Sequence, residues 1–105
     1  SINPEIAVES GKILFLDEPT SGIDPTARRV FWRQITALAA KGTTVIITTH
    51  FMDEAEYCDR IMIQDQGKML ILGTPEEVRN RGGKNLTMNE AFIAIVENSR
   101  RKEEL

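Results

Sequence analysis

The sequence predicts an α/β fold, in which a parallel strand–helix–strand unit is followed by a β-hairpin and C-terminal helices. Two observations support this. Two short apolar or β-branched runs, residues 13–16 and 43–48, flank a segment whose apolar residues recur at helical spacing. After them, two more strand-like runs surround the turn sequence Asp-Gln-Gly at 65–67. Because a helix that joins two strands of one sheet makes a crossover, the first two strands should be parallel.

The first strand ends in two acidic residues. Residues 13–16 are apolar without interruption, which is typical of a parallel strand buried on both faces. Asp17 and Glu18 follow at once, and Pro19 and Gly22 then turn the chain into a loop. In open α/β sheets, ligands bind at the carboxyl ends of the strands. Two acids at that point suit one Mg²⁺ ligand and one group that positions or deprotonates an attacking water.

A helix is expected to begin after this loop. Asp24 fits the N-cap, and Pro25 fits the first helical position. The helical spacing of apolar residues continues to about residue 40, and Gly42 ends the helix. Residues 43–48 are rich in β-branched side chains and predict a second buried strand.

The expected topology brings three polar side chains to one place. Parallel strands end at the same edge of a sheet, and Asp17 and Glu18 leave the first strand there. His50, the only histidine, leaves the second strand at the same edge. We therefore expect the two acids and the histidine to lie close together.

The second half of the chain carries clear start and turn signals. Thr74-Pro75-Glu76-Glu77 and the segment from Thr87 to Glu90 both have the pattern of a capping box. The expected elements are a short helix at 52–58, strands at 60–64 and 68–72, a helix to about 80, a loop at 81–84, a helix to about 98, and a charged, frayed tail at 100–105.

Composition sets limits on the partners. The net charge of −3 does not suggest a nucleic-acid-binding surface. The longest purely apolar run, residues 91–96, is far shorter than the roughly 18 residues that span a bilayer. The single cysteine, Cys58, cannot form a disulfide within the chain, which fits a reducing compartment.

Several motifs resemble those of one protein family. Residues 13–24, Ile-Leu-Phe-Leu-Asp-Glu-Pro-Thr-Ser-Gly-Ile-Asp, closely resemble the Walker B motif and D-loop of the ATP-binding-cassette (ABC) ATPases. Residues 48–50, Thr-Thr-His, resemble the switch-histidine loop, and residues 51–61 and 67–78 are similar to the segments that follow it. The sequence of residues 48–61 is most similar to that of drug-exporter-like, ABC-2-type cassettes. The resemblance implies a partial P-loop NTPase core of the RecA-like ABC type.

The resemblance also implies roles for the residues at the strand ends. Asp17 would orient Mg²⁺, usually through water, and Glu18 would polarise the water that attacks ATP. His50 would read the γ-phosphate and steady Glu18. The alternatives are a strand-end acid bonded to loop amides for Asp17, a solvated turn acid for Glu18 and a structural role for His50.

The loop that follows Asp17 and Glu18 has two interpretations. By resemblance, Asp24 is the D-loop aspartate that communicates across a dimer of cassettes, and Ser21 and Gly22 shape the nucleotide-binding loop. Helix capping explains Asp24 almost as well, and Gly22 could simply supply the turn.

The phosphate-binding loop expected of such an enzyme is not found in this sequence. That loop reads G-x-x-x-x-G-K-[ST], so that backbone N–H groups and a lysine hold the phosphates. Lys12, Lys68 and Lys84 each follow a glycine, but none of these pairs has the earlier glycine or the following Ser or Thr. We therefore expect a single partial domain, the C-terminal half of a nucleotide-binding domain. Its parts would be an atypical leader at 1–12, a cassette-like segment at 13–79, and a helix and tail at 80–105.

The leading functional hypothesis is a fragment of the ATP-hydrolysing subunit of an ABC transporter. Its cofactors would be ATP and Mg²⁺, and its partners a second nucleotide-binding domain and a transmembrane permease, with no nucleic acid. It would lie in the cytoplasm, peripheral to the inner face of the membrane. The isolated chain should be inactive and should self-associate through its unpaired sheet edge. The alternatives are a soluble, non-transport ABC ATPase of DNA repair or translation, and a non-catalytic interaction or folding unit.

Overall fold

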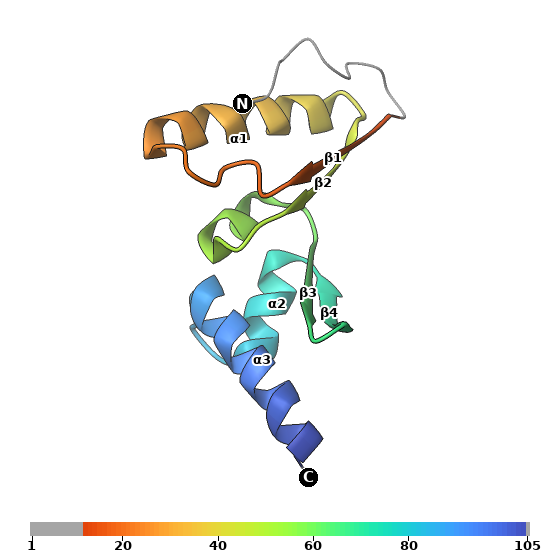
Figure 1. Ribbon diagram of the computed structural model, residues 1–105, viewed down its shortest axis with the longest axis vertical. Coiled ribbons are helices and arrows are strands. Elements are labelled where there is room, and N and C mark those ends of the chain that lie inside the picture. Colours follow the sequence, from red (N-terminus) through yellow and green to blue (C-terminus); the bar gives the residue numbers. More distant parts are fainter. Residues whose placement is uncertain (1–11, 105) are drawn as a thin grey trace. The chain divides into compact units, whose positions relative to one another are not determined.

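The structure is a computed structural model that describes residues 12–104 (Figure 1). The expected leader at 1–12 lies almost wholly outside the described residues. The chain divides into two compact units, Ser1–His50 and Phe51–Leu105.

The first unit is the strand–helix–strand motif. It contains β1 (Ile13–Asp17), α1 (Pro25–Ala40) and β2 (Thr44–Thr48). β1 and β2 pair in parallel, from Ile13 opposite Thr44 to Asp17 opposite Thr48. The prediction of a parallel pair is therefore confirmed, and the strand extends one residue further than expected, to include Asp17.

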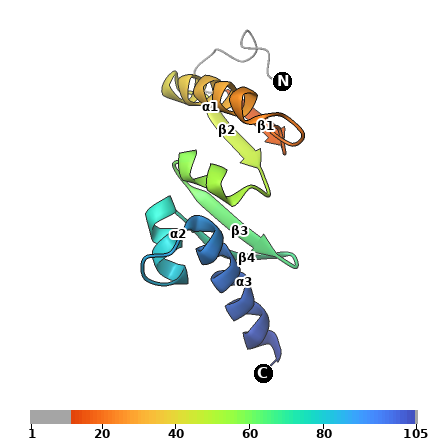
Figure 2. The same cartoon turned by 90° about the vertical axis from the view of Figure 1, so that its left-hand side faces the viewer.

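The helix α1 lies on one face of this strand pair (Figure 1 and Figure 2). Asp24 caps it, because its Oδ1 accepts a hydrogen bond of 2.8 Å from the backbone N–H of Ala27. Its buried side chains are Phe31, Trp32, Ile35 and Leu38.

The opposite face of the strand pair is exposed, so the prediction of strands buried on both faces was wrong. Ile13 is 70% exposed, Phe15 64% and Ile46 44%. Successive side chains of a strand point to opposite faces. Because α1 covers only one face, every second apolar residue remains open to solvent among the residues that the structure describes.

The second unit consists of a hairpin with helices packed against it. It contains a 3₁₀ helix η1 (Met52–Tyr57), an antiparallel hairpin of β3 (Ile61–Asp65) and β4 (Lys68–Gly73), and two helices, α2 (Pro75–Gly82) and α3 (Met88–Glu104). The expected hairpin and its turn are confirmed, since Gln66 and Gly67 both have positive φ, at 52° and 76°. Its core is formed by Ala55, Ile63, Val78, Met88 and Ile95.

Both expected capping boxes are present. Glu77 donates its backbone N–H to the Thr74 hydroxyl, and its carboxylate accepts the N–H of Thr74. Thr87 and Glu90 make the same reciprocal pair. The caps satisfy N–H groups that would otherwise have no partner in the first turns of α2 and α3.

The last residues are helical, so the prediction of a frayed tail from residue 100 was wrong. α3 continues to Glu104. The Arg100 guanidinium donates two hydrogen bonds of 2.9 Å to the Asp65 carboxylate, and Lys68 forms an ion pair with Glu103. These pairs hold the last turns of α3 against the hairpin. Within residues 12–104, no helix combines the length and apolar character that crossing a membrane requires.

Candidate active site at the carboxyl edge of β1 and β2

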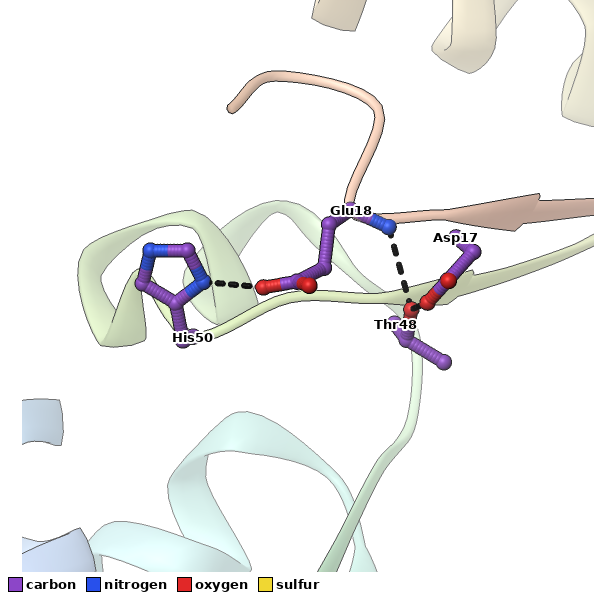
Figure 3. Close-up of polar contacts among 4 residues, drawn as sticks. All are labelled: Asp17, Glu18, Thr48 and His50. Atoms are coloured by element: carbon purple, nitrogen blue, oxygen red, sulfur yellow. Dashed lines mark hydrogen bonds and ion pairs between the residues drawn. The ribbon is translucent and has the colours of Figure 1, made fainter. Parts of the chain in front are cut away.

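The predicted site residues lie at the ends of two parallel strands (Figure 3). Asp17 is the last residue of β1, and the strand register places it opposite Thr48, the last residue of β2. Glu18 continues the ladder, because its N–H donates to the Thr48 carbonyl at 2.9 Å. His50 follows β2 by two residues. The structure thus brings Asp17, Glu18 and His50 to one sheet edge, as the topology predicts.

Glu18 and His50 are in direct contact. Glu18 Oε1 lies within hydrogen-bonding distance of His50 Nδ1. An ionised carboxylate only accepts hydrogen bonds, so Nδ1 must carry the proton in this contact. About half of each side chain is exposed, so the pair can meet a ligand from solvent. The contact fixes the ring relative to the carboxylate.

Glu18 has an unusual backbone conformation. Its φ is +44°, in the left-handed region that non-glycine residues rarely adopt. Such a conformation costs on the order of 1–3 kcal/mol and persists only where the surroundings hold it. The residue before a proline is normally extended, so Pro19 does not favour this conformation. The hydrogen bonds of the Glu18 N–H to Thr48 are therefore part of what presents this carboxylate at the edge.

Thr48 is a site residue that the sequence analysis did not single out. Its hydroxyl accepts the N–H of Glu18 at 3.0 Å and donates to Asp17 Oδ1. The sequence offered only a weak signal, because Thr48 ends a β-branched run and looks like any strand residue. Its significance depends on the register that pairs it with Asp17.

The loop residues Ser21, Gly22 and Asp24 make no side-chain contact with this cluster that would add a ligand or a base to it. Ser21 donates its N–H to the carbonyl of Glu18 at 3.2 Å, and Gly22 has a φ of +79°. The side chain of Asp24 is engaged in capping α1. Among the described residues, the structure shows no side-chain hydrogen bond from Ser21 or Asp24 to either acid or to His50. Capping therefore accounts for Asp24 within this unit.

The acidic edge suits a hard cation that brings ligands of its own. Residues 12–104 contain no group of three or more His, Cys, Asp and Glu side chains that could hold a metal ion. Mg²⁺ is commonly bound by one or two carboxylates, with water and substrate phosphates completing its shell. Asp17, which is exposed at the strand end, is the carboxylate that could serve as such a ligand.

Comparisons with known proteins agree with this geometry. A family model described as "AAA domain, putative AbiEii toxin, Type IV TA system" matches residues 6–51, which include the whole β1–α1–β2 unit. "Probable multidrug ABC transporter ATP-binding protein YbhF" from Escherichia coli (strain K12) is 51% identical over 88 residues, covering 80% of this chain and 15% of the relative. "Nod factor export ATP-binding protein I" from Burkholderia orbicola (strain AU 1054) is 46% identical over 69 residues, covering 65% and 23%.

A solved structure extends the likeness to the fold. The chain superimposes on "Structure of ATP binding subunit of ABC transporter" with a TM-score of 0.72 and 28% identity, covering 80% of this chain and 36% of the other. The chain spans less than a quarter of the two curated relatives. It is therefore homologous to a part of the ABC transporter ATP-binding proteins, and its α/β fold is part of the P-loop NTPase fold of ABC cassettes.

Proposed function

We propose that this chain is the C-terminal half of a nucleotide-binding domain that hydrolyses ATP in an ABC transporter. In this proposal, residues 13–79 are the cassette segment and residues 80–105 are a C-terminal helix and its end. The observation that carries the proposal is the contact between Glu18 and His50, beside Asp17, at the carboxyl edge of two parallel strands. The names of the relatives, both ATP-binding proteins, support it.

Asp17 would hold Mg²⁺, directly or through water. When bound, Mg²⁺ neutralises charge on the β- and γ-phosphates of ATP. The role of Asp17 would be to place a negatively charged oxygen at the end of the strand. The sheet edge is exposed there, so the phosphates could reach it. The Thr48 hydroxyl holds one of its carboxylate oxygens.

Glu18 would position the attacking water and accept its proton. A carboxylate in this role must reach the water directly, and the left-handed backbone of Glu18 turns its side chain out of the strand toward His50. His50 would hold the Glu18 carboxylate through Nδ1 and present Nε2 to the γ-phosphate. A positioned general base contributes roughly 10²–10⁴-fold to a rate.

The loop after Glu18 would meet a second cassette. Ser21 and Gly22 would shape this loop beside the nucleotide. Asp24 would take part in communication with the partner cassette because it lies in this loop. Its side chain would at the same time cap α1. The whole protein would thus require a second nucleotide-binding domain.

Transport would require a transmembrane permease, driven by ATP binding and hydrolysis. The cassette would accordingly lie in the cytoplasm, against the inner face of the membrane. The chain alone should not hydrolyse ATP, because its sequence contains no phosphate-binding loop. The exposed side chains of Ile13, Phe15 and Ile46 favour self-association of the isolated chain.

Calorimetric titration with Mg-ATP tests this proposal. The full-length protein that contains this chain should bind Mg-ATP saturably, and the 105-residue chain should give no heat of binding. Absence of binding to the full-length protein would refute the proposed function. Saturable binding of Mg-ATP to the short chain would instead refute the claim that ATP binding requires a phosphate-binding loop from outside these residues. Light scattering of the short chain at high concentration would refute self-association if it found only monomers.

A further inference from the structure

We infer that Thr48 is a positioning residue for both acids of the site. Its single hydroxyl joins the carboxylate that would hold the metal ion to the backbone of the residue that would act on water. The inference rests on the proposed function of Asp17 and Glu18.

The direction of each hydrogen bond is fixed by chemistry. The backbone N–H of Glu18 can only donate, and it donates to Thr48 Oγ1 at 3.0 Å. An ionised Asp17 carboxylate can only accept, so the proton of the Thr48 hydroxyl points to Asp17 Oδ1. Here one oxygen atom, Thr48 Oγ1, both accepts from Glu18 and donates to Asp17, as a hydroxyl can. A valine of nearly the same shape would lose both bonds.

The bond to Asp17 selects one orientation of an otherwise exposed side chain. Asp17 is exposed at the end of β1, where a short side chain can populate several rotamers. The bond from Thr48 holds Oδ1 and restricts the rotamer, so Oδ2 is the oxygen that would be left to face a cation. Partners of this kind, which hold a metal ligand without touching the metal, typically affect metal affinity or activity by about 10–100-fold.

The bond to Glu18 supports its strained backbone. The same N–H also reaches the Thr48 carbonyl at 2.9 Å, so both oxygens of Thr48 hold it. Because Glu18 has a φ of +44°, loss of the hydroxyl bond would weaken the hold on this conformation and on the contact with His50. Thr48 thereby couples the orientation of the two acids.

Metal affinity is the readout that separates positioning from general stability. In the full-length protein we would compare Thr48→Val, which is isosteric, with Thr48→Ser, which keeps the hydroxyl. Thr44→Val is the matched control, since Thr44 lies on the same face of β2, four residues away from Thr48 and opposite Ile13. Binding of Mn²⁺ with a non-hydrolysable ATP analogue would be followed by electron paramagnetic resonance, and the Mg²⁺ dependence of ATP hydrolysis would be measured in parallel.

The expected result is a loss of about tenfold or more in Mn²⁺ affinity for Thr48→Val. Thr48→Ser should stay within about twofold of wild type, because it retains both hydrogen bonds. Thr44→Val should match wild type. In an Asp17→Ala background, Thr48→Val should have little further effect on Mn²⁺ affinity, since its effect on the metal ion passes through Asp17. Wild-type Mn²⁺ affinity in Thr48→Val would overturn the inference, as would a full additive loss in the double variant.

Failure of the proposed function would give a different pattern. If Glu18→Gln kept wild-type hydrolysis, the proposed role of Glu18 in hydrolysis would be refuted. The Mn²⁺ affinity of Thr48→Val would still test the role of Thr48. Should Thr48→Val fold poorly, Thr48→Ala removes the same hydroxyl with a smaller side chain. A Thr48→Ala protein with wild-type Mn²⁺ affinity would equally overturn the inference.

Discussion

The left-handed backbone of Glu18 predicts an inversion of the usual order of stability between alanine and glycine. Glu18→Ala and Glu18→Gly both remove the carboxylate and its contact with His50. The two variants therefore differ in the cost of holding the backbone at a φ of +44° and in the conformational freedom of the unfolded chain. Glycine adopts this conformation readily, whereas alanine has a Cβ that crowds the backbone.

The magnitude follows from two opposing terms. The left-handed conformation costs an L-residue about 1–2 kcal/mol. Glycine loses about 0.4–1 kcal/mol more than alanine through the greater freedom of its unfolded chain. At the midpoints of these two ranges, Glu18→Gly is more stable than Glu18→Ala by about 0.8 kcal/mol.

Urea unfolding followed by tryptophan fluorescence measures this difference. Trp32 is the only tryptophan and is buried in α1, so its emission reports on the unit that contains Glu18. The control is the same pair of substitutions at Thr44, which lies in a regular strand. There alanine should be the more stable by about 0.5–1 kcal/mol. If alanine were the more stable residue at position 18 as well, the backbone argument for Glu18 would be refuted.

Two further predictions concern the second unit. A Cβ at Gly82 would lie 2.7 Å from the Cα of Ala91, so Gly82→Ala must push α2 and α3 apart. We expect the free energy of unfolding, measured with a chemical denaturant, to fall by about 1–3 kcal/mol. An unchanged denaturation midpoint would contradict this contact. The Arg100 hydrogen bonds hold the pKa of Asp65 below its ordinary value of 3.8. A lowered carboxyl pKa stabilises the fold above the unfolded pKa, and this contribution is lost as the pH falls through the folded one. Arg100→Met should therefore be less stable than wild type at neutral pH, with a difference that shrinks below pH 3.8; a difference independent of pH would exclude this linkage.

The elements that follow from local patterns could be predicted from the sequence. Asp24-Pro25 marked the start of α1, and the helix between two strands required a parallel pair. That topology alone placed Asp17, Glu18 and His50 at one edge. No knowledge of side-chain packing was needed, because parallel strands necessarily end on the same side.

Features that depend on distant partners could not be predicted. An uninterrupted apolar run fits a strand buried on both faces, so the exposure of Phe15 could not be foreseen. The helical end of α3 depends on Arg100 meeting Asp65, which is 35 residues away. Thr48 looked like an ordinary β-branched strand residue until the register paired it with Asp17.

The most direct test of this account is ATP binding and phosphate release by the full-length protein carrying Glu18→Gln. Glu76→Gln is the matched control, since Glu76 is an exposed acid in the first turn of α2. The account predicts that Glu18→Gln binds ATP as wild type does and releases phosphate at least about 100-fold more slowly, while Glu76→Gln is unaffected. Wild-type phosphate release by Glu18→Gln would contradict the assignment of Glu18 as the carboxylate that acts on water.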